Sequence, residues 1–220
     1  MLLLRIFLLF LALTATACVT AAPAVALYYG KQTALKEFRI FDIVVVEPDH
    51  GHNPKNYARP DSQLFAYVSV AEVQASRDYY KDIPGSWKLA RNGDWDSDVL
   101  DQTPEAWPAF FAERIVGPLW AKGYRGFFLD TLDSYRLAKS FDEAAQQRGL
   151  IRVINILHAR FPGIQLILNR GFEIVPKVSD KIRMVAAESL YQGWNASTQR
   201  YEPVKPADRE WLLGQLTSIR

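Results

Sequence analysis

Cysteine is nearly absent from this sequence, in which Cys18 is the only one among 220 residues. One cysteine cannot form an internal disulfide, so an apolar core has to stabilise the fold. Residues 1–24 combine a basic residue, a short apolar run and a small-residue segment, which is the pattern of a secretory signal peptide. We therefore expect a bacterial protein exported to the periplasm or medium. The segment Ala15–Cys18 weakly resembles a lipoprotein box, so a lipid anchor on Cys18 is the alternative.

The chain also lacks a Lys/Arg-rich run, a second long apolar stretch and a short-period repeat. Its net charge is only +2, whereas nucleic-acid-binding domains concentrate basic residues on one face. We expect no nucleic-acid partner. The N-terminal apolar run is shorter than the roughly 20 residues that cross a bilayer, so no transmembrane span is expected. Residues 25–220 are enough for a single domain with a sizeable core.

No G-x-G-x-x-G turn follows the first apolar run, which argues against a dinucleotide-binding sheet. Six short runs are instead apolar almost throughout, which is typical of parallel strands that are buried on both faces. The six expected strands are Ala26–Gly30, Ile43–Glu47, Leu64–Val70, Gly126–Asp130, Gln165–Asn169 and Arg183–Glu188.

Three helices are expected between or after these strands. The first should run from Pro104 to Lys122, with Thr103 as its N-cap and Gly123 at its end, and Pro118 should break it.

The second helix should begin at a capping box of Ser140 and Glu143 and end near Phe161. The third should span Pro206–Ile219. Its buried face should carry Trp211, Leu212, Gln215, Leu216 and Ile219.

The alternation of strands and helices predicts an α/β fold with a parallel sheet. Polar residues lie at the C-terminal end of nearly every expected strand, and in a TIM barrel these ends meet at the face that carries the active site. We therefore expect a (β/α)8-type barrel over residues 25–220. Such barrels have eight strands, so we also expect this one to be truncated after about six β/α units. A smaller α/β domain of unusual arrangement is the alternative.

Asp130 and Glu188 are the candidate catalytic residues, because each ends an apolar strand. Glycoside hydrolysis needs two carboxylates, which lie about 5 Å apart in retaining enzymes and further apart in inverting ones. The alternative is that each acid caps a helix or pairs with an arginine.

Aromatic, acidic and amide side chains near the same strand ends are expected to bind substrate. Aromatic rings stack on sugars and cations, and an acidic groove attracts an amine-bearing polymer. The candidates are Tyr29, Glu47, Tyr67, Glu72, Asp133, Tyr135, Asn169, Arg170, Tyr191 and Trp194. Further residues on this side are Tyr28, Asp49, Asp94, Trp95, Asp98 and Asp101. Ordinary packing of the aromatics and solvation of most of the acids are the alternatives.

His50 and His52 lie close to Asp49 and could bind a metal, but they lack a convincing third ligand. We therefore expect neither a metal nor a cofactor. A metal-dependent hydrolase or deacetylase is a further alternative, which would need a His/Asp triad.

The run GFFLDTLDSY at residues 126–135 resembles the GxFLDxxDxY signature of glycoside hydrolase families 114 and 166. AYVSVAEV, LNRGFE and ESLYQGWN, at residues 66–73, 168–173 and 188–195, resemble further strand ends of these barrels in the same order. The resemblance covers essentially all of the mature chain.

This resemblance implies endo-cleavage of a cationic α-1,4-linked galactosamine or N-acetylgalactosamine exopolysaccharide. It implies a retaining reaction with Asp130 as nucleophile and Glu188 as acid/base, and exopolysaccharide export machinery as a partner. The alternative is a non-catalytic polysaccharide-binding remnant, in which an incomplete barrel does not hold the two acids in register.

Overall fold

The computed structural model describes residues 22–57, 63–195 and 197–219. The expected signal peptide therefore lies outside the described residues, apart from residues 22–24, and so does Cys18. None of the helices in these ranges is long and apolar enough to cross a membrane.

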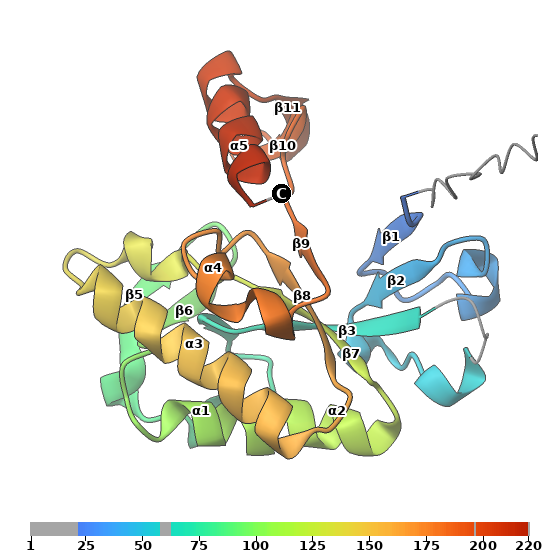
Figure 1. The fold of residues 1–220 in the computed structure, drawn as a ribbon, viewed down its shortest axis with the longest axis horizontal. Coiled ribbons are helices and arrows are strands. Elements are labelled where there is room, and N and C mark those ends of the chain that lie inside the picture. Colours follow the sequence, from blue (N-terminus) through green and yellow to red (C-terminus); the bar gives the residue numbers. More distant parts are fainter. Residues whose placement is uncertain (1–21, 58–62, 196, 220) are drawn as a thin grey trace, which may run out of the picture.

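A six-stranded, fully parallel sheet forms the centre of the molecule (Figure 1). All six predicted strands are present, and they pair in the order β1-β2-β3-β7-β8-β9. Their bounds are β1 Val25–Tyr28, β2 Ile43–Val46, β3 Gln63–Ser69, β7 Gly126–Asp130, β8 Gln165–Asn169 and β9 Met184–Ala186. This confirms the predicted α/β barrel-type fold.

The central strands bury both of their faces, which explains their continuous apolar sequences. On one face, an inner cluster is formed by Ile43, Val45, Phe65, Phe128 and Ile167. The alternate side chains of the same strands join the larger cluster on the other face, which packs against helices. Full burial of each valine, leucine, isoleucine or phenylalanine side chain in these clusters stabilises the fold by about 1.5–3 kcal/mol relative to leaving it exposed.

The first predicted helix differs from expectation at its start and at Pro118. It begins with α1 (Trp107–Phe110), continues as a π-helix (Phe111–Val116) and ends with α2 (Gly117–Lys122). The predicted N-cap Thr103 is wrong, because its N–H binds the Asp101 carboxylate and a turn follows before Trp107.

Pro118 does not break this helix, contrary to the prediction. The Gly117 N–H bonds to the Ala112 carbonyl, five residues earlier, and this wider turn just before Pro118 accommodates a residue that cannot donate a hydrogen bond. The predicted end at Gly123 is confirmed, since Gly123 adopts a left-handed conformation with φ of 112°.

The second predicted helix is α3 (Glu143–Arg160). The predicted capping box is wrong, because Asp142, rather than Ser140, accepts a hydrogen bond from the Ala145 N–H at 2.9 Å. Helices α1, α2 and α3 cover one face of the sheet, and the short α4 (Val175–Val178) follows β8 (Figure 1).

Two small antiparallel sheets were not predicted. One contains β4 (Glu72–Gln74), β5 (Lys88–Asn92) and β6 (Ser97–Leu100), and the other is the hairpin of β10 (Gln192–Asn195) and β11 (Arg200–Pro203). Short 3-10 turns occupy Leu35–Phe38, Pro48–His50, Pro54–Asn56, Tyr80–Asp82, Gly85–Trp87, Ser134–Leu137 and Ser179–Lys181.

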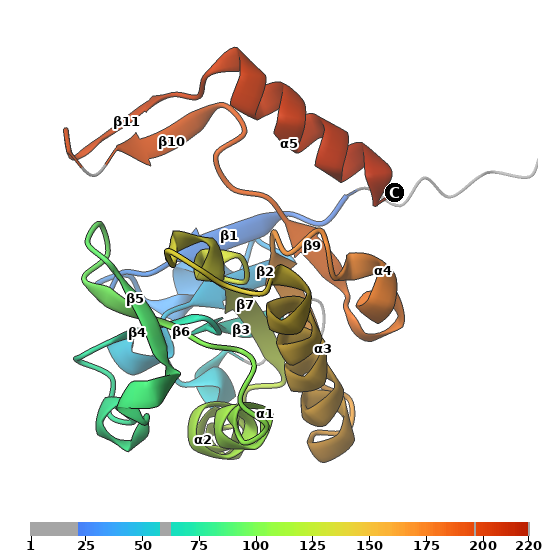
Figure 2. The ribbon, with the colours of Figure 1, turned by 90° about the vertical axis from the view of Figure 1, so that its left-hand side faces the viewer.

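The third predicted helix is α5 (Pro206–Ser218), which stands with the β10–β11 hairpin above the rest of the molecule (Figure 2). Leu212 is buried and Gln215, Leu216 and Ile219 are half-buried, as the predicted face requires. Trp211 departs from that face, because it is 46% exposed.

Candidate active site

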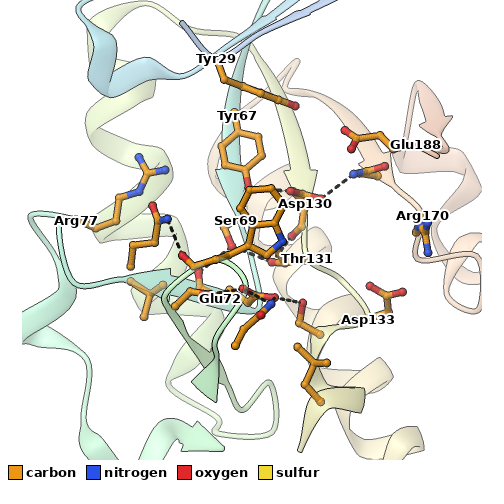
Figure 3. A pocket seen from close by; sticks show the side chains of 18 of the residues that line it. Tyr29, Tyr67, Ser69, Glu72, Arg77, Asp130, Thr131, Asp133, Arg170 and Glu188 are labelled. Atoms are coloured by element: carbon orange, nitrogen blue, oxygen red, sulfur yellow. Dashed lines mark hydrogen bonds between the residues drawn. The ribbon is translucent and has the colours of Figure 1, made fainter. Parts of the chain in front are cut away.

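A cavity of about 600 Å³, which we call the central pocket, opens at the C-terminal ends of the parallel strands (Figure 3). Most of the predicted site residues line it. These are Tyr29, Glu47, Tyr67, Glu72, Asp130, Asp133, Asn169, Arg170 and Glu188. Parallel strands bring their C-terminal ends to one edge, so residues far apart in the sequence meet here.

Asp130 is the last residue of β7, and both of its carboxylate oxygens accept hydrogen bonds. The Tyr67 hydroxyl donates to Oδ2 at 2.7 Å, and the Asn169 amide donates to Oδ1 at 2.8 Å. These donors come from the neighbouring strands β3 and β8. The carboxylate is therefore fixed in one orientation before a substrate arrives.

Glu188 follows β9, and its carboxyl group faces the same pocket (Figure 3). Although the residue as a whole is exposed, partial burial of its carboxyl group raises its pKa, and the negative charge of Asp130 raises it further. The positive charge of Arg170 acts in the opposite direction. A carboxyl group with a raised pKa is suited to donate a proton.

Tyr29 closes another side of the pocket. Its ring lies edge-on to that of Tyr67, with 5.1 Å between the centroids. Burial, followed by the charges of Glu188 and Asp130, raises the pKa of the Tyr29 hydroxyl, which stays neutral. Burial and Asp130 likewise raise the pKa of Tyr67, which remains a hydrogen-bond donor.

Three residues of the pocket have a left-handed backbone conformation, and each directly follows a polar residue near the end of a strand. Thr131, Arg170 and Ser189 follow Asp130, Asn169 and Glu188, and their φ angles are 65°, 60° and 62°. Such conformations cost on the order of 1–3 kcal/mol for non-glycine residues and gather at functional sites.

Thr131 is held in this conformation by its own hydroxyl group. The hydroxyl accepts a hydrogen bond from the Ala71 N–H at 3.0 Å and lies 2.8 Å from the Ser69 hydroxyl. Thr131 was not predicted as a site residue, and no signal in the sequence identifies it, because a β-branched residue rarely adopts this backbone.

Glu47 is buried, and its charge is neutralised within the fold. Arg77 binds its two oxygens at 2.7 and 2.8 Å and also contacts Asp49 at 2.7 Å. Arg77 also lines the pocket, although it was not among the predicted site residues.

Glu72 is also buried, and hydroxyl and amide groups surround its carboxylate. It accepts hydrogen bonds from Ser134 at 2.5 Å, from Asn92 at 3.1 Å and from Ser97. These bonds join β4, β5 and β6 to the segment after β7. Both Glu47 and Glu72 therefore support the pocket wall through internal partners.

Three predicted substrate-binding residues lie outside the central pocket. Tyr135 is 1% exposed and packs edge-on against Phe141, so the expectation that it contacts substrate is corrected. Tyr191 and Trp194 are 66% and 44% exposed and do not line this pocket, because the chain leaves the sheet after Ala186 to form the β10–β11 hairpin. Trp194 lines a second cavity.

Of the other acids named from the sequence, Asp98 and Asp101 have partners within the fold, whereas Asp94 lines a cavity. Asp98 pairs with Lys88 and Arg91 at 2.9 Å, and Asp101 accepts from the Gln146 amide at 2.7 Å. Asp94 lines the second cavity, whereas its neighbour Trp95 lines the central pocket.

His50 and His52, which follow β2, do not belong to a group of potential metal ligands. Within the described ranges, no group of three or more His, Cys, Asp or Glu residues is arranged to hold a metal. The His52 ring lies 3.1 Å from the Gly30 carbonyl oxygen and contacts Tyr28 edge-on.

The chain matches one family model and several solved structures of glycoside hydrolases. The family model described as glycoside-hydrolase family GH114 matches residues 12–209. The glycoside hydrolase domain of PelA from Pseudomonas aeruginosa is 36% identical over 90% of this chain and 80% of that domain, with a TM-score of 0.80. No curated protein sequence matches the chain.

More distant structures share the fold alone. Aspergillus fumigatus Ega3, solved in complex with galactosamine, is 14% identical over 74% of this chain and 64% of its own, with a TM-score of 0.59. An alpha-amylase from Geobacillus thermoleovorans, solved with acarbose, is 8% identical over 74% of this chain and 51% of its own, with a TM-score of 0.50.

Proposed function

The chain belongs to glycoside-hydrolase family GH114, and from this premise we propose that it is an exported, endo-acting hydrolase of an α-1,4-linked galactosamine or N-acetylgalactosamine exopolysaccharide. The PelA glycoside hydrolase domain, which is 36% identical, supports glycoside hydrolysis, and Ega3, which shares the fold and was solved with galactosamine, supports an amino-sugar substrate. The N-terminal pattern supports export, and exopolysaccharide export machinery is the partner that fits such a substrate.

The observation that carries the proposal is the shared position of Asp130 and Glu188. Both line one cavity, and Asp130 is close enough to raise the pKa of Glu188. Two carboxyl groups with different environments are the equipment of a glycosidase, in which one is charged and the other holds a proton.

In the first step, Asp130 attacks the anomeric carbon while Glu188 gives its proton to the departing glycosidic oxygen. The C–O bond breaks, and the sugar is transferred to Asp130 as a covalent ester. The hydrogen bonds from Tyr67 and Asn169 orient the attacking carboxylate.

In the second step, the Glu188 carboxylate takes a proton from water, and the resulting hydroxide attacks the anomeric carbon. The bond to Asp130 breaks and its carboxylate is restored. Two inversions at the same carbon give net retention of configuration.

The neighbouring residues are suited to a polymer of amino sugars. Tyr29, Tyr67 and Trp95 offer aromatic faces to sugar rings, while Asp133 adds negative charge for an amine. Arg170 and Asn169 can bind hydroxyl groups, although Asn169 already holds Asp130.

Cleavage of the purified polymer by the wild type, Asp130→Ala and Glu188→Ala tests this function. We expect each substitution to lower kcat by about 10²–10⁴-fold, with polymer binding retained. NMR of the first-formed reducing ends should show the α anomer. Glu105→Gln is the matched control, because it removes an exposed carboxylate outside the pocket.

Full activity in both alanine variants would exclude these catalytic roles. A β anomer as first product would exclude the retaining mechanism. Binding of the polymer without any cleavage by the wild type would instead support a polysaccharide-binding protein.

A further inference from the structure

A second cavity, which we call the hairpin cavity, adjoins the central pocket and also has a volume of about 600 Å³. It lies between the β10–β11 hairpin, α5 and Asp94 in the turn between β5 and β6. Figure 2 shows this turn rising toward the hairpin. Arg170 and Ser189 line both cavities, so one extended ligand can pass from one to the other.

Two tryptophans give the hairpin cavity aromatic surfaces. Trp194 and Trp211 line it and are 44% and 46% exposed. Each ring is held by an edge-on aromatic neighbour, Tyr201 at 5.4 Å for Trp194 and Phe172 at 6.0 Å for Trp211. Large rings that are fixed in position and open to solvent are typical of ligand-binding surfaces.

Acidic side chains outnumber basic ones in the lining of the hairpin cavity by three to two, and this net negative charge attracts a cationic ligand. Asp94, Glu202 and Asp208 line it together with the cations Lys205 and Arg170. The Glu202 carboxylate accepts hydrogen bonds from Asn195 at 2.9 Å and Thr198 at 2.7 Å, which lower its pKa and keep it ionised. Arg170 meanwhile acts on Glu188 in the central pocket.

We propose that the hairpin cavity is a distal subsite, which binds amine-bearing sugar residues of the polymer several units from the bond that is cleaved. The inference rests on the proposed function, because it requires the central pocket to cleave an amino-sugar polymer. A volume of about 600 Å³ is within the roughly 300–1,000 Å³ that is usual for small-ligand sites. The subsite gives the enzyme a preference for long chains over short ones.

The first test compares cleavage of a short galactosamine oligosaccharide, which fills only the central pocket, with cleavage of the long polymer. Trp194→Ala and Asp208→Asn should each lower kcat/KM for the polymer by roughly 2- to 30-fold, the range expected for loss of one cation–aromatic contact or charge. The rate on the short substrate should stay unchanged. Glu210→Gln is the matched control, since it removes a charge from the same helix outside the cavity.

The second test measures binding without catalysis. In an Asp130→Ala background, the Kd of the polymer should rise with Trp194→Ala and stay constant with Glu210→Gln, whereas the Kd of the short oligosaccharide should not change. Melting temperatures show whether each variant is folded, and Asp208→Asn replaces Trp194→Ala if the latter unfolds.

The distal subsite would be overturned if Trp194→Ala and Asp208→Asn lowered kcat/KM equally for the short and the long substrate. It would also be overturned if neither substitution changed the Kd of the polymer. If the wild type cleaves neither substrate, the proposed function fails, while the binding measurement still decides whether the hairpin cavity holds the polymer.

Discussion

Asp130 is positioned by separate contacts to its side chain and to its backbone. Tyr67 and Asn169 hold the carboxylate, whereas Thr131 fixes the chain immediately after it. The Thr131 hydroxyl donates to the Asp130 carbonyl at 2.6 Å and is itself bonded to Ser69 and Ala71 on the neighbouring strand end. A small shift of this segment moves the reactive oxygens, and displacements of about 1 Å can reduce a rate 100-fold.

Thr131→Val should lower kcat about 10-fold and leave KM nearly unchanged. Valine keeps the shape of threonine but removes the hydroxyl, so the Ala71 N–H loses its acceptor, at a cost of about 1–3 kcal/mol. Thr131→Ser keeps the hydroxyl and should retain most of the activity. Steady-state kinetics on the polymer check both variants. A serine variant as impaired as the valine variant would show that the hydroxyl is not the important group.

Arg170→Gln should shift the alkaline limb of the pH profile of kcat/KM to higher pH. Glu188 must be protonated to act as an acid, so activity falls as the pH rises through its pKa. Arg170 lowers that pKa, and its removal therefore raises it. Arg170→Lys keeps the charge and should leave the limb in place. A limb that moves to lower pH, or does not move, would contradict the assignment of Glu188 as the acid.

Single site residues could be predicted from the sequence where two conditions were met: a side chain of suitable chemistry, and a position at the end of an apolar strand. Asp130 and Glu188 meet both conditions. Arg77 and Thr131 do not, because the role of Arg77 depends on Glu47, 30 positions away, and that of Thr131 depends on its backbone angle. Tyr135 was misassigned, since the turn after Asp130 directs its ring into the core.

Gln102 joins several elements at one buried point, beside the end of β6. Its side chain accepts from the Trp107 indole at 2.7 Å and donates to the Leu100 carbonyl at 3.1 Å. Its N–H donates to Gln146 of α3 at 2.8 Å. This contact requires α3 to approach the Gln102 backbone closely, and Gly149 is the residue at that point.

Gly149→Ala should reduce the free energy of unfolding by about 1–3 kcal/mol or more, because its Cβ would lie 1.9 Å from the Gln102 carbonyl oxygen. Gly214→Ala is the matched control. It also lies within a helix, α5, but its Cβ would meet no atom within 4 Å, so it should stabilise by about 0.4–1 kcal/mol. Urea denaturation of both variants provides the comparison. Equal stability changes would contradict a tight contact between α3 and Gln102.

The elements that were predicted well are those with a strong apolar pattern. All six parallel strands and the helices α3 and α5 follow from it. The start of the first helix and the N-cap of α3 were misplaced, because several neighbouring residues can cap a helix and only the packed structure selects one. The short strands of the two antiparallel sheets are rich in polar residues, so they lack the continuous apolar run that identified the parallel strands.

Across the whole molecule, charge is nearly balanced, with 26 basic and 24 acidic residues. A uniform attraction for a cationic polymer is therefore excluded, and binding has to arise from local charge. The central pocket and the hairpin cavity supply it through Asp130, Asp133, Asp94 and Asp208.

Local attraction of this kind predicts a salt dependence that differs between two forms of the substrate. Exposed charges interact over a Debye length of about 10 Å at 0.1 M salt and about 3 Å at 1 M. Raising the salt concentration over this range should therefore increase KM for the deacetylated, cationic polymer by roughly 3- to 10-fold, as expected for the loss of two or more surface charge contacts. The fully N-acetylated polymer carries no amine charge, so its KM should stay constant, and kcat should stay constant for both forms. If KM changed equally with salt for the two polymers, the acidic side chains would not contribute to recognition of the amine, and aromatic stacking would determine binding instead.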